Sequence, residues 1–177
     1  MSYATRRSVM AILALGLAGL WMAVPGSAEA QSDKELFSIG RSTNRNVLKY
    51  AIKLAQRGQP DAEQPVSAYW VMHEAGGRRE SLTWFEQRFA YGWEIVGPVA
   101  NEGFVMKLSV FGQRHIRITR RGSDYKALVQ VRDRPAFLER VFVKTKEGGA
   151  FPKVLYVELH GRDAATGKAV SERITNQ

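Results

Sequence analysis

Apolar and polar residues alternate along most of this chain, and residues that favour turns recur about every ten positions. This spacing is typical of an antiparallel sheet. The clearest hairpin has the two-residue turn Gly122-Ser123, a favoured type with glycine first. Pairing Arg121 with Asp124 across this turn places Ile118 opposite Ala127, which gives one apolar face and one basic or polar face. A slip of one residue would mix the two faces, so the pattern specifies the register.

Further strands are expected where the same alternation recurs. They are residues 36–42, 66–72, 104–110, 138–146, 153–160 and 169–174. Residues 46–56 fit two structures, because Leu48, Tyr50 and Ile52 alternate as in a strand while the Ala, Leu, Lys and Gln content favours a helix ended by Gly58. The sequence therefore predicts a mainly β fold, an antiparallel barrel or sandwich of about eight or nine strands with one short helix.

That helix is expected at residues 81–91. Ser81 can cap its start, and Gly92 can end it. Leu82, Phe85 and Phe89 would share one face of the helix, which we expect to pack on the core.

The first thirty residues have the layout of a secretory signal peptide. Arg6 and Arg7 precede an uncharged, apolar run over residues 9–24, and Ala28-Glu29-Ala30 supplies the pattern that a signal peptidase cleaves. We therefore expect a signal peptide at 1–30 and a single β-rich domain at 31–177, periplasmic or secreted after cleavage. The paired arginines also fit a twin-arginine signal, so the export route stays open.

Composition and charge narrow the chemistry. The chain has no cysteine, which excludes disulfides, cysteine-ligated zinc, iron–sulfur clusters and thiol catalysis. It has 26 Lys and Arg against 17 Asp and Glu, a net charge of +9. Residues 107–146 hold much of this excess, and Arg117, Arg121 and Lys126 share the polar face of the hairpin. Such a patch attracts polyanions, for which we expect an anionic lipid, lipopolysaccharide or an acidic polysaccharide and no nucleic acid.

A second set of residues surrounds Arg41. Arg41 continues the inward face of Phe37 and Ile39, and a buried arginine needs a carboxylate, for which Glu86 or Glu158 are the candidates. The set is either an anion-binding site at a pocket mouth or a structural Arg–Glu pair beside a turn shaped by asparagines. The candidate binding residues are Arg41, Asn44, Asn46, Tyr69, Glu86, Tyr156 and Glu158.

The remaining chemistry is sparse. Seven aromatic residues between positions 69 and 93 either line an apolar ligand cavity or fill the core. The three histidines, His73, His115 and His160, are scattered, and no metalloprotease, hydrolase or lactamase motif occurs. We therefore assign no catalytic residue, no metal ligand and no cofactor.

Several segments, taken in order, resemble the domain-of-unknown-function family 4833, small exported bacterial proteins. The matching stretches are 37–47 with Tyr50, 65–66 with Tyr69-Trp70, Leu82-Thr83, Glu86, 90–92, 154–163, Thr166-Gly167 and Glu172. The resemblance implies that residues 46–54 form a strand, and it implies no activity.

These observations predict a non-enzymatic periplasmic module that binds, or structurally supports, an anionic or amphiphilic component of the cell envelope. The alternative is a small periplasmic hydrolase that uses Glu86 and Glu158 as a carboxylate pair. Such a pair needs both carboxyl groups in one open cleft.

Overall fold

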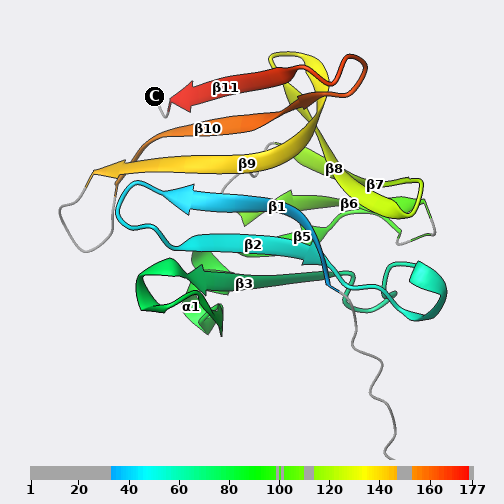
Figure 1. Ribbon diagram of the computed structural model, residues 1–177, viewed down its shortest axis with the longest axis horizontal. Coiled ribbons are helices and arrows are strands. Elements are labelled where there is room, and N and C mark those ends of the chain that lie inside the picture. The colour runs from blue at the N-terminus through cyan, green and yellow to red at the C-terminus, as the bar shows by residue number, and fades with distance from the viewer. Residues whose placement is uncertain (1–32, 99, 101, 110–113, 147–152, 176–177) are drawn as a thin grey trace, which may run out of the picture. The chain divides into compact units, whose positions relative to one another are not determined.

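A computed structural model describes residues 33–98, 100, 102–109, 114–146 and 153–175 (Figure 1). The expected signal peptide at 1–30 lies outside the described residues. The strands are β1 (Lys34–Arg41), β2 (Val47–Ile52), β3 (Val66–Met72), β4 (Arg78–Ser81), β5 (Trp93–Ile95), β6 (Gly103–Leu108), β7 (His115–Arg121), β8 (Asp124–Val131), β9 (Arg134–Lys146), β10 (Lys153–Asp163) and β11 (Ala169–Thr175). The helix α1 spans Trp84–Phe89, and short 3₁₀ turns lie at Gln56–Gly58 and His73–Ala75.

These strands form one sheet that curls into a half-barrel, in the order β4-β3-β2-β1-β9-β8-β7-β6-β5, with β10 and β11 joined to β9 (Figure 1). The long strand β9 makes the curl possible. Its first residues pair with β8, its residues Arg140–Val143 pair with β1, and β10 follows its other edge along most of its length. Strand β9 therefore joins the N-terminal hairpins to the rest of the sheet.

The mainly β fold with one short helix is confirmed. In the β7–β8 hairpin Arg121 pairs with Asp124 and Ile118 with Ala127, so the predicted register is correct. The ambiguous segment 46–56 contains strand β2, as the family resemblance implied. The pattern missed the short strands β4 and β5, and it did not anticipate that β1 and β9 pair in parallel.

The core lies on one face of the curled sheet. Across β1, β2 and β3 the paired residues Ile39, Leu48 and Trp70 are buried together. Across β9 and β10 the same face continues through Val141 and Leu159. We call this the inner face and the opposite one the outer face, because neighbouring residues on a strand point to opposite sides.

The helix differs from its prediction in length, cap and orientation. It begins after Thr83, whose hydroxyl accepts the backbone N–H of Glu86 while the Glu86 carboxylate accepts the N–H of Thr83. This reciprocal capping box fixes the start of the helix, whereas Ser81 belongs to β4. Phe85 and Phe89 share a face as expected, but they are 47% and 60% exposed. Leu82 packs against the core as expected. The expected core packing of Phe85 and Phe89 is wrong, because Glu86 is the helix residue that turns toward the sheet.

Candidate functional site

Arg41 ends the inner face of β1 and packs against two aromatic rings that contact each other. Its guanidinium carbon lies 4.3 Å from the centre of the Trp70 ring and 6.0 Å from the centre of the Tyr91 ring. Its Nη1 donates a hydrogen bond of 3.5 Å to the Tyr91 hydroxyl. The Nε atom is buried without a hydrogen-bond partner. Two rings thus stabilise the cation, while one of its donors remains unused.

Glu86 is near Arg41 but does not pair with it. One oxygen of Glu86 accepts the indole N–H of Trp70 at 3.1 Å, and the other accepts the backbone N–H and the hydroxyl of Thr83 at 2.9 and 3.0 Å. The expected Arg41–carboxylate pair is therefore wrong for Glu86, whose carboxylate is engaged by the indole and by the helix cap. We call Arg41, Trp70, Glu86 and Tyr91 the Arg41 cradle.

Glu158 lies on the other face of the sheet. Arg41 pairs with Val143, and Val143 pairs with Val157, so Val157 shares the inner face and Glu158 points outward. There Glu158 accepts two hydrogen bonds from Arg173, at 2.9 and 2.7 Å. These bonds hold the pKa of the Glu158 carboxyl below its usual value. The expectation that Glu158 meets Arg41 is wrong, because the strand alternation separates the two side chains.

Asn44 and Asn46 shape the turn between β1 and β2. Asn44 accepts the backbone N–H of Asn46 at 3.2 Å, and the buried Asn46 accepts the backbone N–H of Glu74 at 3.2 Å. Glu74 in turn accepts the N–H of Arg45 at 3.1 Å. The two asparagines thus tie this turn to the segment after β3, which is the turn-shaping role considered from the sequence.

Tyr69 and Tyr156 both lie on the outer face, each under an arginine. Arg79 lies 4.5 Å above the Tyr69 ring, and Arg173 lies 4.2 Å above the Tyr156 ring. The seven candidate residues therefore do not converge. Arg41 and Glu86 belong to the cradle, the asparagines to a turn, and the two tyrosines and Glu158 to the outer face.

The aromatic residues divide into two groups. Phe37, Tyr50 and Trp93 pack in series, with ring centres 4.7 and 6.1 Å apart, and Trp70 meets Tyr91 at 5.3 Å. The Tyr50 hydroxyl donates to the Tyr91 carbonyl at 2.7 Å, and burial raises the pKa of Tyr50 far above its usual value. These rings fill the interior, as one of the two interpretations held.

The second aromatic group is on the surface. We call Trp84, Phe85 and Phe89 the α1 aromatic patch; Phe89 lies 5.9 Å from Trp84 and 4.9 Å from Phe85, measured between ring centres. Trp84 is 73% exposed. The core-filling interpretation is wrong for this group. Tyr91 of the cradle follows the last residue of this patch, Phe89, by two positions in the sequence.

The basic residues of the hairpin occupy the positions that alternation assigned to them. Arg117, Arg121 and Lys126 are all exposed on the outer face of β7 and β8. Arg121 also lies 5.4 Å from the centre of the Phe137 ring. Within the described residues, no group of three or more His, Asp or Glu side chains is placed to hold a metal ion.

Sequence reasoning missed the partners of Arg41. Trp70 and Tyr91 were visible as aromatic residues, but nothing in their spacing showed that they would enclose a residue of β1. The pattern Thr-x-x-Glu at Thr83 and Glu86 is the sequence signal of this capping box, and it indicates the observed start of the helix better than Ser81 does.

Taken together, the curled sheet and the cradle define a small β protein with an arginine on its inner face that forms no ion pair with any carboxylate in the described part of the chain. The family model described as Domain of unknown function (DUF4833) matches residues 37–173, so the chain belongs to this family. No curated protein and no solved structure matches the chain. In the part of the chain that the structure describes, no helix is long and apolar enough to cross a membrane.

Proposed function

We propose that this protein is a non-enzymatic module that binds an anionic amphiphile of the bacterial cell envelope after export. The observation that carries the proposal is the guanidinium of Arg41. It lies against Trp70 and Tyr91, and no described carboxylate forms an ion pair with it. A planar cation in apolar surroundings favours a carboxylate or phosphate head group.

The α1 aromatic patch supports the apolar half of the ligand. Trp84 and Phe89 are large, exposed and in contact with each other, and such clustered apolar surface often marks a binding site. The patch is linked to the cradle through Glu86, which belongs to the same helix and contacts Trp70. A head group at Arg41 would therefore leave its alkyl chain close to aromatic surface.

The carboxylate-pair hydrolase receives no support from these positions. Glu86 contacts Trp70 of the inner face, whereas Glu158 is held by Arg173 on the outer face. This separation is the reason why we favour a binding role over the carboxylate-pair hydrolase.

A titration with a monomeric amphiphile tests the proposal. Dodecyl phosphate, kept below its micelle concentration, should quench or shift the tryptophan fluorescence of the purified protein, because Trp70 lies against Arg41. Neutral dodecyl maltoside should bind more weakly. Arg41→Gln should weaken dodecyl phosphate binding by at least about tenfold, the equivalent of one charge-assisted contact.

The matched control is Arg117→Gln, which removes the same charge from the exposed outer face. It should leave the affinity for dodecyl phosphate within about twofold, since exposed charges contribute little to a specific contact. Equal losses in the two variants, or equal affinity for the neutral and the anionic detergent, would overturn the proposal.

A further inference from the structure

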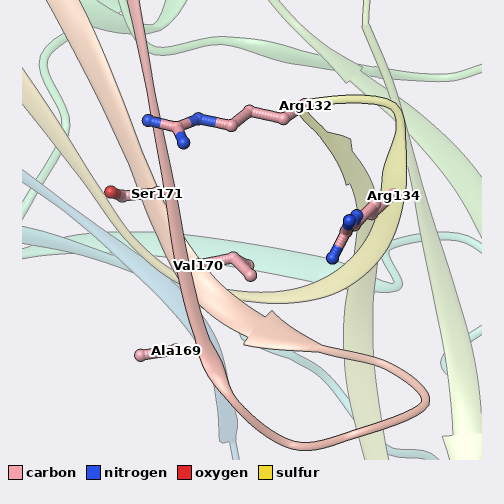
Figure 2. A pocket seen from close by; sticks show the side chains of 5 residues that line it. All are labelled: Arg132, Arg134, Ala169, Val170 and Ser171. Carbon is pink, nitrogen blue, oxygen red and sulfur yellow. The ribbon is translucent and has the colours of Figure 1, made fainter.

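A pocket of about 430 Å³ lies far from the cradle along the sheet, between the β8–β9 turn and the edge strand β11 (Figure 2). Its lining residues are Arg132, Arg134, Ala169, Val170 and Ser171. In Figure 2 the Arg132 side chain extends from the turn toward β11, while Arg134 and Val170 point toward one another. The pocket thus combines two cations with a hydroxyl and a small apolar wall.

The guanidinium groups of Arg132 and Arg134 make no side-chain hydrogen bond and no ion pair with another described residue. Each acts on a nearby carboxylate only through its charge, Arg132 on Glu172 and Arg134 on Asp163. The nearby carboxylate of Glu172 is already occupied, since it accepts two bonds from Arg114, at 3.0 and 2.6 Å, and the backbone N–H of Arg132 at 2.8 Å.

The carboxylate of Asp163, at the end of β10, is occupied as well. It accepts the N–H of Ala165 at 3.0 Å, and the N–H and hydroxyl of Thr166 at 2.8 and 2.9 Å. Asp133, in the same turn, is a further acidic group beside the two arginines. The ten N–H donors of the two guanidinium groups make no described hydrogen bond and are available to a ligand.

The turn that carries these arginines is in an unfavourable conformation for one of its residues. Arg132 has a φ of 48° and Asp133 a φ of 61°. Aspartate adopts such angles readily, but arginine does not, so the strain is at Arg132. Asn-Gly would suit this turn better. Such backbone strain persists where the surroundings impose it and is concentrated at functional sites. Here the bond from the Arg132 N–H to Glu172 holds the turn over the pocket.

We infer that this pocket is a second ligand site, separate from the cradle, that binds the phosphate group of a phosphomonoester. Two arginine forks match the oxygens of a phosphate dianion better than those of a monoanion. The pocket volume admits a group the size of a phosphorylated sugar. The phosphate belongs either to a soluble sugar phosphate or to a lipid head group.

Calorimetric titration with glucose 6-phosphate, and co-sedimentation with phosphatidylcholine vesicles that contain phosphatidic acid, test the site and separate the two sources. Binding in at least one format is expected, and the double variant R132Q/R134Q should weaken it by at least about tenfold. Binding of the soluble ester identifies a free sugar phosphate, and binding of the vesicles alone identifies a head group. The control R45Q/R57Q removes two exposed charges that belong to no proposed site and should retain most of the affinity.

A turn variant separates binding from folding. Arg132→Asn removes the guanidinium and better suits the positive φ, so it should keep or raise the melting temperature while it lowers the affinity for the phosphate probe. Asp133→Asn should raise that affinity, because it removes one negative charge beside the two arginines. Absence of binding in both formats would overturn the inference. So would an equal loss in R45Q/R57Q and in R132Q/R134Q.

Discussion

At the residue scale the central feature is an arginine whose partners are aromatic rings. Alternation along β1 predicted that Arg41 faces inward, and it does. The general rule for buried charges then pointed to a carboxylate partner. Trp70 and Tyr91 take that place, because a cation over a ring face is stabilised without an opposite charge. The alternation of residues along β1 was enough to predict that the Arg41 side chain points inward. Its aromatic partners depended on the curl of the sheet, which brings α1 to the end of β1.

This difference predicts a small stability effect for Arg41→Met. Removing one member of a buried ion pair costs about 3–5 kcal/mol. Loss of ring contacts alone, offset by removing the buried Nε that has no partner, should cost less than about 2 kcal/mol. Urea denaturation of Arg41→Met beside Arg117→Met measures it. If the free energy of unfolding falls by about 3 kcal/mol or more, as when one member of a buried ion pair is removed, a carboxylate does neutralise Arg41.

At the element scale, the capping box decides where α1 starts. Thr83→Ala removes the hydroxyl that accepts the Glu86 N–H and should lower the free energy of unfolding by about 0.5–2 kcal/mol. Ser81→Ala, at the cap position expected from the sequence, should change it by less than about 0.5 kcal/mol. Denaturant melts of the two variants compare them directly. A larger effect from Ser81→Ala would contradict the observed helix start.

A second element-scale prediction concerns the contact of β6 with β7. Gly103 has a φ of 126°, and a Cβ there would lie 1.8 Å from the Ile118 carbonyl oxygen. Gly103→Ala must therefore displace one of these strands, and we expect a loss of at least about 2 kcal/mol. Gly40→Ala is the matched strand variant, since a Cβ at Gly40 meets nothing within 4 Å. It should be neutral or slightly stabilising in thermal melts, and comparable losses in both variants would refute the close approach.

The sequence predicted most of the strands and the helix, but it predicted their lengths, bulges and ends less well. The β7–β8 register was specified because a slip exposes apolar residues, and β2 was resolved by the family resemblance. The strand β5 has only three residues, too few for alternation to show. The β9–β10 register shifts at Leu155, and this bulge leaves the leucine exposed, whereas regular alternation would put it on the same face as Val157.

At the scale of the whole domain, Glu172 connects the edge strand to the β7–β8 hairpin. Its carboxylate accepts bonds from Arg114 and from the N–H of Arg132. These bonds hold the pKa of the Glu172 carboxyl below its usual value, and the bonds from Arg114 contribute more than the bond from the Arg132 N–H. A lowered pKa adds stability above the unfolded-state pKa, and this stability is lost as the pH falls through the folded value.

Glu172→Gln should therefore cost about 1–3 kcal/mol at pH 7, because a charge-assisted network loses its acceptor. The difference from the wild type should shrink as the pH falls below the usual pKa of a glutamate toward the lowered value. Urea denaturation across that pH range measures both quantities. Glu139→Gln is the control, because Glu139 pairs with Arg162 in an exposed salt bridge and should contribute little. A pH-independent difference would contradict the ionised network.

Closure of the sheet was the part of the fold that the sequence could not show. The parallel pairing of β1 with β9 joins residues about one hundred positions apart, and local alternation carries no information on such partners. For the same reason, local sequence could not show which candidate site residues lie together. Residues were assigned to one site by type, and the sheet then separated Glu86 from Glu158 by placing them against opposite faces.

The most direct test of ligand binding at Arg41 is native mass spectrometry of the protein purified without detergent from the cells that produce it. We expect the wild-type protein to carry a non-covalently bound anionic lipid or glycolipid. Arg41→Gln should lose this ligand, and Arg117→Gln should retain it. A wild-type spectrum with no bound amphiphile, or the same bound mass in Arg41→Gln, would contradict the claim that Arg41 anchors the ligand.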